Sequence, residues 1–181
     1  MDLLLGTIDF DVFDRCDAHD LALPIFLEDR PPMGLAGLAD WRLHGLVSNW
    51  IARRFIEPRE AKPVLYGGDS RLSFDRIFIQ PMGSMADIKA ADLARRNEEF
   101  ASVISLAGVH DLACPVPGLG AEGIEDEYAL EQWLATLEIH LENPRVTLFL
   151  PGHLLEIASG KGQSAGWNTE LISMEKENGS Y

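Results

Sequence analysis

The sequence feature that most constrains the fold is an almost entirely apolar run at residues 21–27, LALPIFL. A strand that is apolar at every position has both faces buried, which is typical of a parallel sheet covered by helices on two sides. Residues 35–55 follow it with apolar side chains at every third or fourth position, which predicts an amphipathic helix. This order of strand and helix indicates a layered α/β domain.

The same alternation continues along the chain. We predict further strands at residues 3–13, 64–66, 76–80, 112–116 and 146–150, and further helices at residues 85–109 and 125–141. The predicted fold class is α/β, with a mixed, mostly parallel sheet and helices on both faces as three layers. We expect residues 1–150 to form the domain. Residues 151–181 have scattered glycines and no sustained period, so we expect a partly disordered tail with a short helix at residues 154–158.

The charge of the chain argues against several classes of partner. Fifteen Lys and Arg against 29 Asp and Glu give a formal net charge of −14 over 181 residues. Contact with a nucleic-acid backbone needs clustered basic residues, and anionic membrane surfaces repel an acidic protein. We therefore expect no nucleic-acid and no membrane partner. The acidic start Met1-Asp2 is unlike a signal peptide, and no apolar run is long enough to span a bilayer, so we expect a cytoplasmic protein.

The cysteines and histidines show no spacing that is typical of metal binding. Cys16 and Cys114 lie far apart, and the five histidines lie in separate segments. Two free thiols and a Cys16–Cys114 disulfide both fit the sequence. Because no nucleophile elbow, phosphate-binding loop or H-E-x-x-H motif occurs, we expect no catalytic residue, no metal site and no cofactor.

Two glycine-containing loops are the candidate ligand sites, because α/β domains bind ligands where such loops lead from a strand into a helix. The first loop is flanked by Arg30 and Arg42 and contains Gly34 and Gly37. The second reads G-x-G-x-x-G and contains Gly118, Gly120 and Gly123. Acidic residues that repel an anionic ligand and favour the helix N-terminus crowd the second loop: Glu122, Glu125, Asp126 and Glu127. Structural turns and a nucleotide pocket both remain open for these loops.

Trp41 is a candidate contact residue for a partner or a second subunit. It lies off the apolar stripe of its predicted helix, between Asp40 and Arg42. Tryptophan is enriched in protein interfaces, while ordinary packing is the simpler alternative.

Residues 21–26, LALPIF, and residues 30–43, RPPMGLAGLADWRL, closely resemble the N-terminal domain of the M17 leucyl aminopeptidases. In that family a strand leads through an acidic, proline-containing turn to a helix that reads like G-x-x-x-x-L-D-W-R-L. The resemblance covers residues 1–150 and implies a macro-like fold. The segment CPVPGLG at residues 114–120 also looks like the strand and loop with which ADP-ribose-binding macrodomains hold a phosphate.

The resemblance does not extend to the catalytic half of those enzymes. M17 enzymes place two metal ions and the catalytic Lys and Arg in a C-terminal domain marked by N-T-D-A-E-G-R-L, and the nearest fragment here is Asn168-Thr169-Glu170. The first loop also lacks the Asn-rich segment and triple glycine of ADP-ribose binders. Three hypotheses follow. The chain is a non-catalytic domain that self-associates or docks on a full-length aminopeptidase homologue, a module that binds a small molecule such as a nucleotide or ADP-ribose, or a peptidase whose metals come from a second chain.

Overall fold

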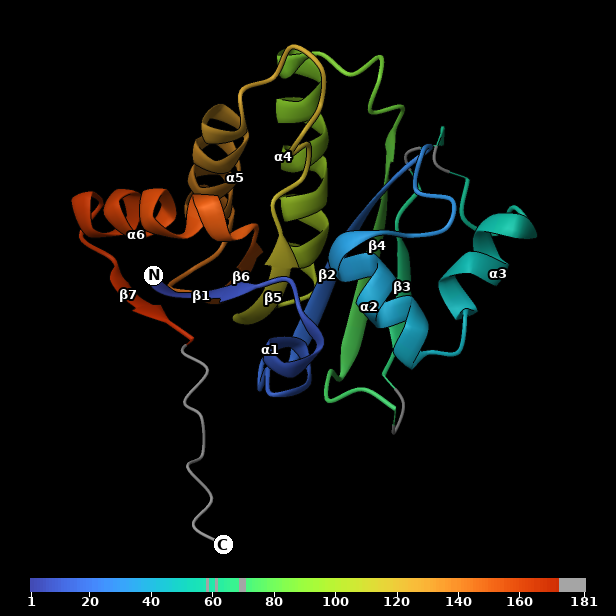
Figure 1. Cartoon of the computed structure of the whole chain (residues 1–181), viewed down its shortest axis with the longest axis horizontal. Coiled ribbons are helices and arrows are strands. Elements are labelled where there is room, and N and C mark those ends of the chain that lie inside the picture. The colour runs from blue at the N-terminus through green and yellow to red at the C-terminus, as the bar shows by residue number, and fades with distance from the viewer. Residues whose placement is uncertain (58, 61, 69–70, 173–181) are drawn as a thin grey trace, which may run out of the picture.

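The computed structural model describes residues 1–57, 59–60, 62–68 and 71–172, and these contain a seven-stranded sheet (Figure 1). The strand order is β3-β4-β2-β5-β6-β1-β7. Six strands run parallel, namely β1 (Asp2–Thr7), β2 (Asp20–Phe26), β4 (Arg76–Gly83), β5 (Asp111–Pro115), β6 (Arg145–Leu150) and β7 (Asn168–Leu171). β3 (Val64–Gly67) is antiparallel to β4 at one edge. The predicted mixed, mostly parallel sheet is confirmed.

Helices cover both faces of the sheet and complete three layers. One face carries α1 (Phe10–Asp14), α2 (Gly34–Arg42) and α3 (Leu46–Ala52), and the other carries α4 (Ala90–Leu106), α5 (Asp126–His140) and α6 (Leu155–Ser164). In β2, Leu21, Leu23 and Ile25 belong to the core under the first group of helices. Ala22 and Phe26 belong to the core under the second. β2 is therefore apolar throughout because it supplies both cores.

Two predicted elements are divided in the structure. The strand predicted at residues 3–13 is wrong beyond Thr7, because Asp9 caps α1 by accepting a hydrogen bond from the N–H of Val12 at 2.9 Å. The single helix predicted at residues 35–55 is also wrong. The chain turns at His44 and Gly45, whose φ angles are 55° and 77°, and α3 begins after this turn.

The C-terminal segment has a helix where the sequence predicted a short one, at residues 154–158, but it is more structured than the expected tail. Residues 152–171 form the 3₁₀ turn η1 (Gly152–Leu154), α6 and β7, and β7 pairs with β1. Leu154 and Ala158 are buried in the core, so this segment packs on the sheet. The ordered structure thus continues past the expected boundary at residue 150. The rest of the expected tail, residues 173–181, lies outside the described residues.

Both cysteines are buried free thiols, so the disulfide alternative is wrong. Burial raises the pKa of Cys114 to about 12 and raises the pKa of Cys16 as well. In the described part of the chain, every helix is too short or too polar to cross a bilayer.

Candidate functional site

The two predicted glycine loops lie at the carboxyl edge of the parallel sheet, where ligands bind in open α/β folds. The first loop is shorter than predicted, because Gly34 and Gly37 lie in α2, whose first residue is Gly34. Residues 27–33 connect β2 to α2, and residues 116–125 connect β5 to α5. Residues 84–89, which connect β4 to α4, begin at the same edge because β4 is parallel to β2. Three connections therefore share this edge.

The carboxylate of Glu28 occupies the hydrogen-bond donors that follow β4. It accepts from the hydroxyl of Ser84 and the N–H of Met85, each at 2.8 Å, and from the N–H of Ala86 at 3.4 Å. Burial raises the pKa of the Glu28 carboxyl, but these hydrogen bonds stabilise its charged form more and hold the pKa below the ordinary value of 4.5. The hydrogen-bond donors at residues 84–86 thus bind a carboxylate of the protein itself, that of Glu28.

The second loop has the same arrangement. The N–H of Gly120 donates to Oδ1 of Asp126 at 2.8 Å, and Asp126 is the first residue of α5. Oδ2 of Asp126 lies 3.7 Å from Nε2 of His153. The sequence predicted that acidic residues near this loop oppose an anionic ligand. In the structure, one of these acidic residues, Asp126, accepts the hydrogen bond from the N–H of Gly120 in the loop.

Each predicted glycine meets a backbone requirement. Four have a positive φ, which glycine adopts without strain: Gly34 (55°), Gly118 (82°), Gly120 (75°) and Gly123 (77°). A Cβ on Gly37 would lie 2.8 Å from the carbonyl oxygen of Pro32, and a Cβ on Gly118 would lie 2.6 Å from Cδ2 of Leu93. These requirements account for glycine at all five positions whether or not a ligand binds.

The two arginines that flank the first loop lie at opposite ends of α2. Arg30 is exposed and precedes Gly34, whereas Arg42 is the last residue of the helix. The guanidinium of Arg42 pairs with both carboxylate oxygens of Asp14, with Nε 2.9 Å from Oδ1. Arg42 therefore connects α2 to α1 and does not extend to the loop.

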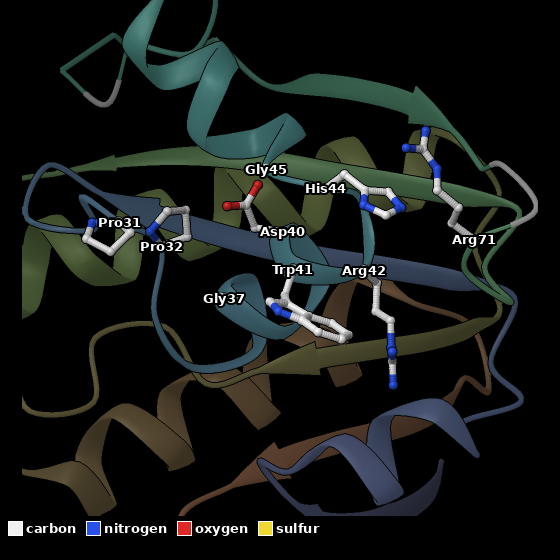
Figure 2. Close-up of a pocket in the computed structure, with 9 residues that line it drawn as sticks. All are labelled: Pro31, Pro32, Gly37, Asp40, Trp41, Arg42, His44, Gly45 and Arg71. Carbon is white, nitrogen blue, oxygen red and sulfur yellow. The ribbon is translucent and has the colours of Figure 1, made fainter.

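Trp41 projects from α2 and is 64% exposed. Its ring centroid lies 5.1 Å from that of Phe10, in an edge-to-face arrangement, and 4.8 Å from the guanidinium carbon of Arg42. An open hollow of about 820 Å³ runs beside it along α2. Figure 2 shows Pro31 and Pro32 at one end of this hollow and Arg71 at the other, with Trp41 between them. Trp41 and Arg42 of α2 thus form a cluster with Phe10 of α1.

Sequence reasoning missed the role of Glu28, because its donors lie 56 to 58 residues away and no local pattern connects them. Asp126 did have a local signal, since an acidic residue in the first helical turn favours nearby N–H groups. Within the described ranges, no three His, Cys, Asp or Glu side chains come together as a group that could hold a metal ion.

The carboxyl-edge geometry can be compared with known proteins. No family model and no curated protein matches the chain. Solved structures do match. The macrodomain of Mycobacterium tuberculosis DarG superposes with a TM-score of 0.60 at 15% identity, over 81% of this chain and 98% of that chain. The chain has a macro-like fold.

Two further similar structures show how widely this fold is shared. Thermosipho africanus DarTG, in complex with ADP-ribose, matches with a TM-score of 0.56 at 17% identity, over 76% of this chain and 39% of that one. A K354E mutant of tomato leucine aminopeptidase matches with a TM-score of 0.51 at 13% identity, over 92% of this chain and 36% of that one. At these identities the likeness establishes the macro-like fold alone, and the more specific resemblance to the M17 N-terminal domain is not established by it.

Proposed function

We propose that this macro-like domain binds a nucleotide-type small molecule, ADP-ribose or a close relative, at the carboxyl edge of its sheet. The observation that carries the proposal is that the backbone donors of this edge already hold oxyanions. Gly120 binds the Asp126 carboxylate, and the segment after β4 binds the Glu28 carboxylate. Phosphate oxygens are oxyanions of the same kind and suit the same donors.

The comparisons support this proposal over the other functions considered. One of the matching structures holds ADP-ribose, and most of the similar structures are macrodomains. The loop at residues 117–123 has the glycines with positive φ that let a ligand approach the backbone closely. Because Asp126 is only partly buried and Glu28 is exposed, both carboxylates can move away when a phosphate arrives.

The carboxylates also set the expected strength of binding. A phosphate must displace Asp126 from Gly120 while the acidic residues around the start of α5 repel it. We therefore expect wild-type affinity for ADP-ribose in the millimolar range, and tighter binding when the competing carboxylate is removed.

Isothermal titration calorimetry with ADP-ribose tests the proposal, with the wild-type chain and Asp126→Ala measured side by side. Binding by both, with tighter binding by the variant, supports it. Absence of heat with both proteins at millimolar ADP-ribose overturns it, because Asp126→Ala leaves the Gly120 donor free.

We propose protein contact as a second function, which the exposure of Trp41 favours. A large aromatic side chain held by Phe10 and Arg42 beside a hollow is a typical anchor for a partner. Under the M17 resemblance, the partner is a second copy of this chain or a full-length aminopeptidase homologue. Analytical ultracentrifugation with and without such a homologue tests this function, and a strict monomer with no complex argues against it.

We also propose that the chain is not a peptidase by itself, since the sequence lacks the M17 catalytic motif. An assay with leucyl substrates and added Zn²⁺ or Mn²⁺ tests this, and turnover by the purified chain would overturn it.

A further inference from the structure

His153 lies beside the second glycine loop and faces the carboxylate that occupies it. It belongs to η1, shortly after the end of β6, and its side chain is 67% exposed. Its Nε2 lies 3.7 Å from Oδ2 of Asp126, whose Oδ1 accepts the hydrogen bond from the N–H of Gly120 at 2.8 Å. One carboxylate group therefore spans the gap between a backbone donor of the loop and an imidazole nitrogen.

This geometry also suits a phosphate group in the place of that carboxylate. Two oxygens on one central atom are only a little farther apart in a phosphate than in a carboxylate. A phosphate that replaces Asp126 can therefore accept the hydrogen bond from Gly120 through one oxygen and face Nε2 of His153 with another. Histidine is the side chain that ordinarily gains its positive charge between pH 5 and 8, so the contact with His153 depends on pH.

The charged groups around His153 are mostly acidic. In the described part of the chain, Asp126 on α5 has the only carboxylate within 4 Å of a ring nitrogen of His153. The second loop and the first turns of α5 and α6 add four more carboxylates, those of Glu122, Glu125, Glu127 and Glu156. Lys161 on α6 pairs with Glu127 and Glu131. A proton on His153 thus offsets part of the repulsion between this surface and a phosphate.

We propose that His153 is a phosphate-binding residue of the nucleotide site and makes the affinity of that site rise as the pH falls. This inference rests on the proposed nucleotide-binding function. Asp126 stays attached to α5 when a phosphate takes its place on Gly120, so the occupied site holds two anions where the free site holds one. Two anions favour the protonated imidazole more than one does. Binding therefore takes up a proton from solution above about pH 6.5, where histidine is ordinarily neutral.

Isothermal titration calorimetry with ADP-ribose at pH 6 and pH 8 measures this dependence. Each phosphate of ADP-ribose has a single acidic group that stays ionised at both values, so the charge of the ligand does not change. The wild type should bind about three- to fivefold more tightly at pH 6, roughly the effect of one close unit charge in water. At pH 7 the binding enthalpy should vary with the ionisation enthalpy of the buffer, which reports the proton taken up.

Two variants of the exposed His153 separate its charge from its size. His153→Gln does not titrate, so its affinity should be the same at both pH values and close to that of the wild type at pH 8. His153→Lys is charged at both and should bind at pH 8 about as tightly as the wild type at pH 6. His19→Gln is the matched control and should keep the wild-type pH dependence. His19 is also exposed and faces a carboxylate, that of Asp75 at 3.1 Å, but it precedes β2 at the opposite edge of the sheet.

The outcomes separate this inference from the function on which it rests. Equal wild-type affinity at pH 6 and pH 8 overturns the role of His153 and leaves nucleotide binding standing. A His153→Gln variant that keeps the wild-type pH dependence does the same. If neither the wild type nor Asp126→Ala binds ADP-ribose at either pH, the nucleotide-binding function itself fails, and the inference fails with it.

Discussion

The N–H of Gly120 donates a hydrogen bond to Oδ1 of Asp126 at 2.8 Å, so the glycine loop between β5 and α5 carries an oxyanion supplied by its own helix. Glu28 does the same for the donors after β4. The carboxyl edge of this sheet is thus a place where backbone donors and carboxylates are paired, and the proposed affinity for a nucleotide depends on how readily those pairs open.

Replacing Asp126 with alanine should tighten ADP-ribose binding about fivefold or more, roughly the effect of removing one close unit charge in water. Calorimetry measures this change. Glu127→Ala is the matched control, because Glu127 is also an acid in the first turn of α5 but its Oε2 faces Nζ of Lys161, at 3.9 Å. Equal tightening by both variants would mean that general charge, and not the Gly120 donor, limits binding.

Glu28 and Asp29 should titrate with shifts of opposite sign. Burial raises the pKa of Asp29 above 3.8 despite a hydrogen bond from the N–H of Phe26. The pKa of Glu28 lies below 4.5 because its hydrogen bonds outweigh burial. Carbon-detected NMR titration of the side-chain carboxyls measures both midpoints. A Glu28 midpoint at or above 4.5 would contradict the contacts with Ser84 and Met85.

These shifts determine how stability depends on pH. The contribution of Glu28 is present above its unfolded pKa and is lost as the pH falls below about 4.5 through the folded value. Asp29 has the reverse sign, because its raised pKa favours the protonated carboxyl and stability is lost as the pH rises through that value. Urea denaturation from pH 3 to 7 should therefore show less acid destabilisation in Glu28→Gln than in the wild type, and more in Asp29→Asn.

Arg76→Met should lower the free energy of unfolding by about 3 kcal/mol, because it leaves a buried carboxylate without its partner. Arg76 donates to both oxygens of Asp20, at 2.6 and 2.7 Å, and to the carbonyl oxygen of Ala107 at 2.7 Å. Asp20 is only 2% exposed. Arg95→Met is the control, since the Arg95–Glu99 pair is exposed and should contribute about 0.5 kcal/mol or less. Urea denaturation compares them, and equal losses would contradict the prediction.

Gly118→Ala should destabilise the protein by about 2 kcal/mol or more. The φ of 82° is strained for alanine, and the new Cβ would lie 2.6 Å from Cδ2 of Leu93 on α4. Gly152→Ala is the control, because no atom lies within 4 Å of the added Cβ, and its effect should stay within about 0.5 kcal/mol. Thermal unfolding followed by circular dichroism measures both changes. If Gly118→Ala left the stability of the protein unchanged, the loop would have to adopt another backbone conformation.

The layered fold could be predicted because its main elements have strong local patterns. β2 and β6 are apolar runs, and α5 repeats apolar side chains at helical spacing, so each indicates its own structure. Two boundaries were missed although signals were present. Asp9 is an N-cap residue inside an apparently continuous strand, and Gly45 lies inside an apparently continuous helix. In both places the apolar period continues across a break that one polar or glycine residue causes.

β7 had no such signal. Its four residues, NTEL, are mostly exposed and have no clear alternation, and the strand forms because the edge of β1 offers it hydrogen-bond partners. Pairing with a distant edge depends on tertiary contacts and is not encoded in a local pattern.

The sequence by itself determined the alternation of strands and helices, the glycines at the two loops and the excess of acidic residues. Those features depend on residue type and on spacing within a few positions. Only the tertiary structure decided that Glu28 binds the donors at residues 84–86 and that Arg42 pairs with Asp14. The reason is that hydrogen bonds and charge pairs act over a few ångströms in space, and only folding brings residues 28 to 58 positions apart to that distance.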